Sequence, residues 1–179
     1  MNAHEFVIKL RNIAPAKAAL LASDYGSDEA DGFIESFECR RRRDPLGIES
    51  NDDSMLDLLD KWDISHVKIG PICFHAEPVQ FDGHLEIGTV EGDRLVYRPD
   101  MKDYVLLDWQ DLSHVMCDVA AQGDLFLDGL FEIRLWLARN AVNEIDLDDE
   151  SIGVEAKDKC IAAFGGSKYE SFCSILLGV

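Results

Sequence analysis

The spacing of apolar residues changes twice along this chain, and these changes restrict the folds that it can adopt. Helical spacing covers residues 2–12, 15–25, 28–39 and 55–62. Short strand-like runs then follow at residues 66–74, 85–90, 94–97 and 104–108. Helical spacing returns at residues 112–121, 124–141 and 154–164, with a last short element at 169–177. Helices before and after one block of strands predict an α+β fold.

Short connections between the strand-like runs indicate how the sheet is built. Glu91-Gly92-Asp93 is a glycine-containing loop of hairpin length, and residues 98–103 form the next turn. We therefore expect a central antiparallel sheet of about four to six strands, within residues 66–108 and flanked by N-terminal and C-terminal helices. No repeat, low-complexity tract or linker divides the chain, so residues 1–179 are predicted to form a single domain.

The charge of the chain is strongly acidic and unevenly distributed. Asp and Glu number 35 against 17 Lys and Arg, for a net charge of −18. Residues 44–179 carry 28 of the acidic and 10 of the basic side chains, so all of the excess lies there. This balance repels nucleic acid and anionic membranes and favours a basic partner. No apolar run approaches the ~20 residues of a membrane span, and Met1–Leu10 lacks the pattern of a secretion signal. We therefore predict a cytoplasmic location.

The sequence contains no recognisable catalytic, metal or cofactor motif. The glycine-rich nucleotide-binding patterns and the serine nucleophile pattern are missing. Five dispersed cysteines, with no Cys-x-x-Cys pair, predict buried reduced thiols. His66, His75 and His84 do not have a known ligand spacing, so we predict no metal. The remaining enzymatic alternative is a hydrolase that uses Glu86 and His84.

Four consecutive arginines, Arg40 to Arg43, follow the third helical segment. They could bind phosphate, but positive charge also offsets the dipole at the end of a helix. The acidic surroundings favour the second interpretation, and we predict a helix end here.

Two acidic clusters are candidates for a partner-binding surface. They comprise Asp52, Asp53, Asp57, Asp60 and Asp63, and Asp146, Asp148, Asp149 and Glu150. Such clusters commonly serve solubility alone. Together with the net charge, they also suit a surface that attracts a basic protein over long range. Trp62 and Trp109 are candidate aromatic anchors, although core packing is the more frequent role of tryptophan.

Several segments resemble one protein family. They are Ile69–Phe74, Leu85–Gly88, Arg94–Tyr97, Val105–Asp108, the helical segment with Ala120, Ala121, Phe126, Leu127 and Leu130, and Cys160–Phe172. Their order and apolar pattern over residues 27–177 resemble the SUKH superfamily, which includes many bacterial immunity proteins and a yeast cell-wall regulator.

This resemblance implies an α+β domain that neutralises a toxin, often a nuclease or deaminase, without catalysis of its own. The acidic surface independently suits a basic toxin, whose cleft the acids would cover. We therefore expect a non-catalytic immunity protein without cofactors. A regulatory scaffold with several protein partners remains the main alternative, and oligomeric state stays open.

Overall fold

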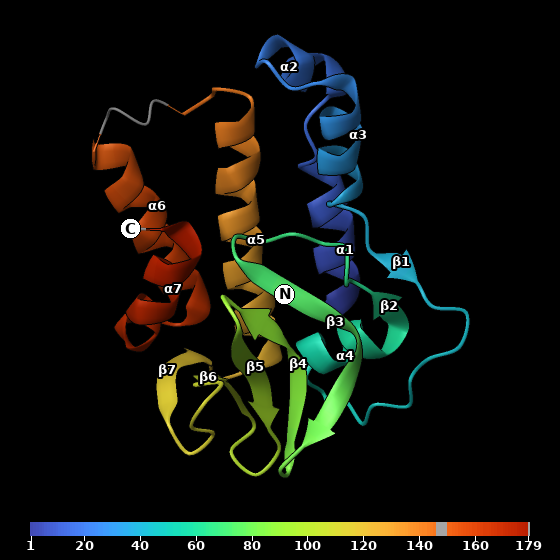
Figure 1. The fold of residues 1–179 in the computed structure, drawn as a ribbon, viewed down its shortest axis with the longest axis vertical. Helices are drawn as coiled ribbons and strands as arrows, with labels where there is room; N and C mark the ends of the chain where they lie inside the picture. The colour runs from blue at the N-terminus through green and yellow to red at the C-terminus, as the bar shows by residue number, and fades with distance from the viewer. Residues whose placement is uncertain (146–149, 179) are drawn as a thin grey trace.

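The base of the molecule is a five-stranded antiparallel sheet (Figure 1). The computed structural model describes residues 1–145 and 150–178. The strands, in their order across the sheet, are β3 (Ile72–Phe81), β4 (His84–Val90), β5 (Asp93–Arg98), β6 (Asp103–Leu107) and β7 (Val115–Ala120). Each strand pairs with the next along the chain, so the sheet is a meander. The predicted α+β fold with flanking helices is confirmed.

The sheet lies later in the chain than its predicted limits of 66–108. Its first strand begins at Ile72, and its last strand occupies most of the segment 112–121 that we expected to be a helix. The helix prediction was wrong because an apolar run this short suits either structure. The segment forms a strand because it pairs with β6, where Leu106 lies opposite Cys117. Cys117 and Val119 then reach the core while Met116 points outward.

Helices cover the sheet and most match the predicted segments. They are α1 (Ala3–Asn12), α2 (Lys17–Ala22), α3 (Ser27–Glu35), α4 (Ser54–Lys61), α5 (Gly123–Ala141), α6 (Glu150–Phe164) and α7 (Glu170–Leu177), with a 3-10 turn η1 (Ser167–Tyr169) before the last. The side chain of Asn2 caps α1 and that of Asp53 caps α4. Both are residues whose side chains accept hydrogen bonds from the free N–H groups at a helix start.

The four arginines do not end a helix, contrary to the prediction. Helix α3 stops at Glu35, and β1 (Arg40–Arg41) pairs with β2 (Trp62–Asp63) in a separate two-stranded sheet. The guanidinium of Arg41 lies 5.8 Å from the ring centre of Trp62. Arg42 donates hydrogen bonds to the carbonyl oxygens of Leu59 and Ala76. The arginines therefore join α4, β2 and β3 instead of offsetting a helix dipole.

Helix α5 stands between α1 and the pair α6–α7 (Figure 1), and it contacts α1, α4, α6 and β7. An aromatic row runs from the sheet through this helix. Ring centres are 5.1 Å apart for Tyr97 and Tyr104, 4.9 Å for Tyr104 and Phe126, and 6.4 Å for Phe126 and Phe172. Most buried apolar residues, from Ala3 to Leu176, belong to this core, and Val96, Val105 and Leu107 of the sheet form a separate small cluster.

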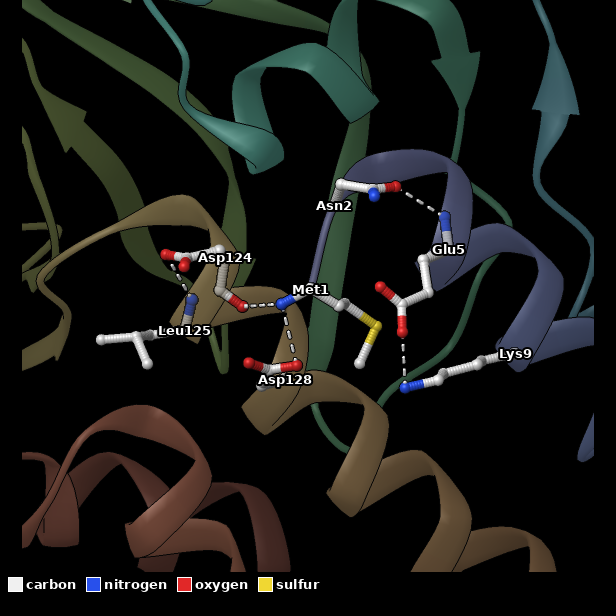
Figure 2. A network of polar contacts seen from close by, with 7 residues as sticks. All are labelled: Met1, Asn2, Glu5, Lys9, Asp124, Leu125 and Asp128. Atoms are coloured by element: carbon white, nitrogen blue, oxygen red, sulfur yellow. Dashed lines mark hydrogen bonds and ion pairs between the residues drawn. The ribbon is translucent and has the colours of Figure 1, made fainter.

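The amino end of the chain is held against the start of α5 (Figure 2). The Met1 ammonium donates to Asp128 Oδ1 at 3.0 Å and to the carbonyl of Asp124 at 3.2 Å. On the adjacent turn of α1, Lys9 forms an ion pair with Glu5 at 2.9 Å. The Met1 contacts join the start of α1 to α5, while the Glu5–Lys9 pair lies within α1, whose Phe6 and Leu10 enter the core.

The cysteines are all free thiols. Cys39, Cys117, Cys160 and Cys173 are buried, as predicted, whereas Cys73 on β3 is exposed. Burial raises the pKa of Cys39 from 9.0 to about 12. Burial and the nearby carboxylate of Asp118 raise the pKa of Cys117 to about 11. The folded protein therefore keeps these protons at pH values where the unfolded chain releases them.

Stability is accordingly expected to fall as the pH rises above about 9. The folded state then binds more protons than the unfolded state, so each such thiol lowers the free energy of unfolding by about 1.4 kcal/mol per pH unit. Below pH 9 this loss is absent. Urea unfolding between pH 8 and 10 measures the slope, which Cys39→Ala should reduce and the exposed control Cys73→Ala should not. An unchanged slope in Cys39→Ala would contradict the assignment.

Candidate protein-binding surface

In the first predicted acidic cluster, residues 52–63, most carboxylates form hydrogen bonds or ion pairs within the protein. Asp60 Oδ1 accepts hydrogen bonds from the backbone N–H groups of Gly47 and Ile48, at 2.7 and 3.0 Å. Asp57 forms an ion pair with Lys61. Asp63 Oδ1 accepts from the Ser65 N–H at 2.9 Å, and this hydrogen bond lowers the pKa of Asp63 against the opposing effect of burial. These carboxylates are therefore only partly available to a partner.

Asp53 has the most extensive internal role of this cluster. Its Oδ1 accepts from the N–H groups of Met55 and Leu56, each at 3.0 Å, and from the hydroxyl of Tyr104 at 2.6 Å. Its Oδ2 accepts from the N–H of Gly123 at 2.9 Å. Asp53 thus joins the start of α4, the sheet and the start of α5. Its neighbour Asp52 is exposed and lines a surface cavity of about 480 Å³.

The second predicted cluster is placed only in part. Asp146, Asp148 and Asp149 lie outside the described residues, and Glu150 is the first residue of α6. Their partner-binding role stays a prediction.

A different acidic surface lies at the turn between β6 and β7, and Asp side chains hold its backbone. Asp108 Oδ1 accepts from the Gln110 N–H at 2.7 Å, and Asp93 Oδ1 accepts from the Trp109 N–H at 3.2 Å. Asp111 Oδ1 accepts from the N–H and hydroxyl of Ser113, and these bonds lower the pKa of Asp111. The turn is closed by a 3.1 Å bond from the Asp108 N–H to the His114 carbonyl.

Three large apolar side chains project from this turn and the start of β7. Trp109 is 60% exposed, Met116 46% and Val115 39%. We call these three residues, with Asp93, Asp108 and Asp111, the tip surface. Exposed apolar side chains that are rimmed by polar groups mark a candidate protein-binding surface when they form one patch.

The two tryptophans considered as anchors have opposite environments. Trp62 is 7% exposed and packs in the core, as the more frequent role of tryptophan predicts, whereas Trp109 is exposed and does not. Sequence reasoning missed Val115 and Met116 because it placed them in a helix. The sequence did indicate that Trp109 is exposed, through the run Asp108-Trp109-Gln110-Asp111. A tryptophan that is surrounded by polar turn residues has few apolar neighbours along the chain to pack against.

The alternative hydrolase pair, Glu86 and His84, is arranged differently from the hypothesis. Glu86 is 7% exposed, and its Oε1 lies 2.8 Å from His75 Nε2 while its Oε2 accepts from Arg94. The Arg94 guanidinium lies 4.4 Å from the ring centre of Phe81. Both carboxylate oxygens are thus engaged by β3 and β5, and the partner histidine is His75 instead of His84.

Residues 1–145 and 150–178 contain no group of three or more His, Cys, Asp or Glu side chains arranged to hold a metal ion. Across that same part of the chain, no helix combines the length and apolarity needed to cross a bilayer. In comparisons with known proteins, the chain matches no family model, no curated protein and no solved structure.

Proposed function

We propose that this protein binds and neutralises a basic partner protein, a toxin of the nuclease or deaminase class, with the tip surface at the centre of the contact. The observation that carries this proposal is the exposure of Trp109. Its side chain is 60% exposed, on a turn whose backbone is held by Asp93, Asp108 and Asp111. The resemblance to the SUKH superfamily supports the toxin class.

The tip surface has the composition of an interface centre. Tryptophan is enriched among the residues that contribute most binding energy. Its large rigid ring removes much apolar surface from water on binding and loses little conformational entropy. The hydrogen bonds of the turn fix the backbone that carries Trp109 before a partner arrives, so binding need not order the turn. Val115 and Met116, at the start of β7, are exposed as well and can add apolar area to the contact.

The charge of the protein explains which partner would be favoured. With a net charge of −18, the protein attracts a cationic surface and repels an anionic one. A toxin that acts on nucleic acid carries a basic cleft for phosphates, and carboxylates such as Asp108 and Asp111 can pair with the same cations. Occlusion of that cleft would neutralise the toxin without any catalysis by this chain.

Affinity capture is the first test. The tagged protein is recovered from its native cells at low and moderate salt, and bound proteins are identified by mass spectrometry. One stoichiometric basic partner whose association slows with salt is expected. Several substoichiometric partners would favour the regulatory scaffold, and no partner for the folded protein would contradict the proposal.

Trp109→Ala is expected to weaken the captured complex by about 30-fold or more, since truncating a central aromatic residue costs about 2 kcal/mol of binding energy. Isothermal titration calorimetry with the purified partner measures this change. Met101→Ala is the matched control, because Met101 is 66% exposed on the turn between β5 and β6. Equal effects of the two substitutions would exclude the tip surface as the centre of the contact.

Charge reversal tests whether the predicted acidic clusters contribute. Asp52→Lys changes an exposed carboxylate, and Asp146, Asp148 and Asp149 can be changed to Lys together. If either set takes part, the association rate should fall and its salt dependence should weaken. Unchanged association rates in both sets of variants would show that neither acidic cluster takes part in binding, and that the tip surface makes the contact without them.

A further inference from the structure

A second candidate site lies away from the tip surface, between α3, α5 and the segment that precedes β3. It is a surface cavity of about 250 Å³. Phe33 of α3 and Arg134, Leu137 and Asn140 of α5 line it, and Lys68 lies on the third side. The spacing of three residues between these positions of α5 places them on one face of that helix.

Arg134 is a buried cation in this cavity. Its side chain is 2% exposed, and its guanidinium carbon lies 3.5 Å from the ring centre of Phe37 and 4.9 Å from that of Phe33. Within residues 1–145 and 150–178 its one hydrogen bond goes to the Ser36 hydroxyl, and its Nε is buried without a partner. Burial lowers the pKa of Arg134 to about 10, so the group still carries its charge at neutral pH.

This burial is costly because no acid compensates it. The chain has 35 acidic residues, yet no described carboxylate lies within ion-pair distance of Arg134 or of Lys68. A charge taken out of water needs a counter-charge or hydrogen bonds to all of its donors. The contacts with the Phe33 and Phe37 rings offset only part of this cost. An anion in the cavity would supply the missing partner.

We propose that this cavity binds a small monocarboxylate with a flat apolar body. Arg134 lines the cavity, and a planar guanidinium can donate parallel hydrogen bonds to a carboxylate; Lys68, which is exposed and also lines the cavity, adds positive charge. Phe33 and Leu137 provide apolar walls for the remainder of the ligand. A volume of about 250 Å³ is below the range for drug-sized ligands or nucleotides, so the ligand has few atoms.

Phosphate fits the site less well than a monocarboxylate. A dianion meets stronger repulsion from a protein with a net charge of −18, and it has no apolar part to place against Phe33 and Leu137. The proposal is independent of the function proposed above, since the tip surface and this cavity share no residue.

Sodium benzoate is the probe for the test, with sodium phosphate at equal ionic strength as the comparison. The Nε–Hε signal of Arg134 is followed in ¹H–¹⁵N NMR spectra, and the melting temperature is measured in parallel. Benzoate should shift this signal saturably and raise the melting temperature, whereas phosphate should do so more weakly. An equal response to phosphate, or no saturable shift with benzoate, would overturn the proposal.

Arg134→Met should weaken benzoate binding at least about tenfold, because the carboxylate loses a charge-assisted pair of hydrogen bonds. Arg139→Met is the matched control, since Arg139 is exposed on the same helix, where it pairs with Glu144 at 3.6 Å. Leu137→Trp fills the cavity while keeping Arg134, and it should also abolish binding in a folded protein. Benzoate binding that persists in Leu137→Trp would overturn the assignment.

Discussion

Asp53→Ala is expected to lower the free energy of unfolding by about 3 to 7 kcal/mol. The loss of an N-cap costs about 1 kcal/mol. The buried hydroxyl of Tyr104 and the N–H of Gly123 would each lose an acceptor, at about 1 to 3 kcal/mol apiece. Since a domain of this size is stable by about 5 to 15 kcal/mol, this one change removes a large part of the total.

Chemical denaturation followed by circular dichroism measures the effect. Asp52→Asn is the matched control, because Asp52 is exposed and asparagine tolerates its positive φ of 68°. It should change the stability by less than about 0.5 kcal/mol. Asp53→Asn should be intermediate: one oxygen can still cap α4, but its amide NH₂ would face the Gly123 N–H where Oδ2 now accepts.

A double-mutant cycle separates the Tyr104 contact from the helix cap. Tyr104→Phe removes only the hydroxyl and should cost about 1 kcal/mol. In the Asp53→Ala background, Tyr104→Phe should lower the free energy of unfolding little further, because the Tyr104 hydroxyl that Asp53→Ala leaves without an acceptor is then absent. Strict additivity of the two changes would show that the 2.6 Å contact contributes nothing to stability.

Gly129→Val is expected to cost about 3 kcal/mol or more, because it forces α6 away from α5. A Cβ atom at Gly129 would lie 2.3 Å from ring carbons of Phe164, far inside van der Waals contact. Phe164 is fully buried, so its ring has little room to move. The close approach of these two helices therefore requires glycine at this position, despite the cost of glycine within a helix.

Thermal and urea unfolding measure this effect, and the structure supplies a control of opposite sign. A Cβ atom added at Gly153 of α6 would have no neighbouring atom within 4 Å, so Gly153→Ala should stabilise the protein by about 0.5 to 1 kcal/mol. Adding Phe164→Leu to Gly129→Val should cost less than the sum of the two single changes, since the smaller side chain makes room. A Gly129→Val protein as stable as the parent would refute the packing argument.

The candidate site was predictable only in part. Trp109 could be selected as a possible anchor from its polar neighbours, but its exposure depends on where the β6–β7 turn projects. Val115 and Met116 were assigned to a helix, so their contribution to the same surface was missed. In the first acidic cluster, charge density alone could not distinguish the exposed Asp52 from Asp53, whose oxygens accept bonds from residues 51 and 70 positions away.

The sequence by itself determined the order of most helices and strands, the α+β class and the acidic charge, because these follow from local spacing and composition. Tertiary structure alone decided three further features. Pairing with β6 made residues 115–120 a strand, and pairing with Trp62–Asp63 drew Arg40–Arg41 into a strand as well. Packing against α3 buried Arg134 between phenylalanine rings. Each depends on contacts between segments distant in the chain, which local patterns do not encode.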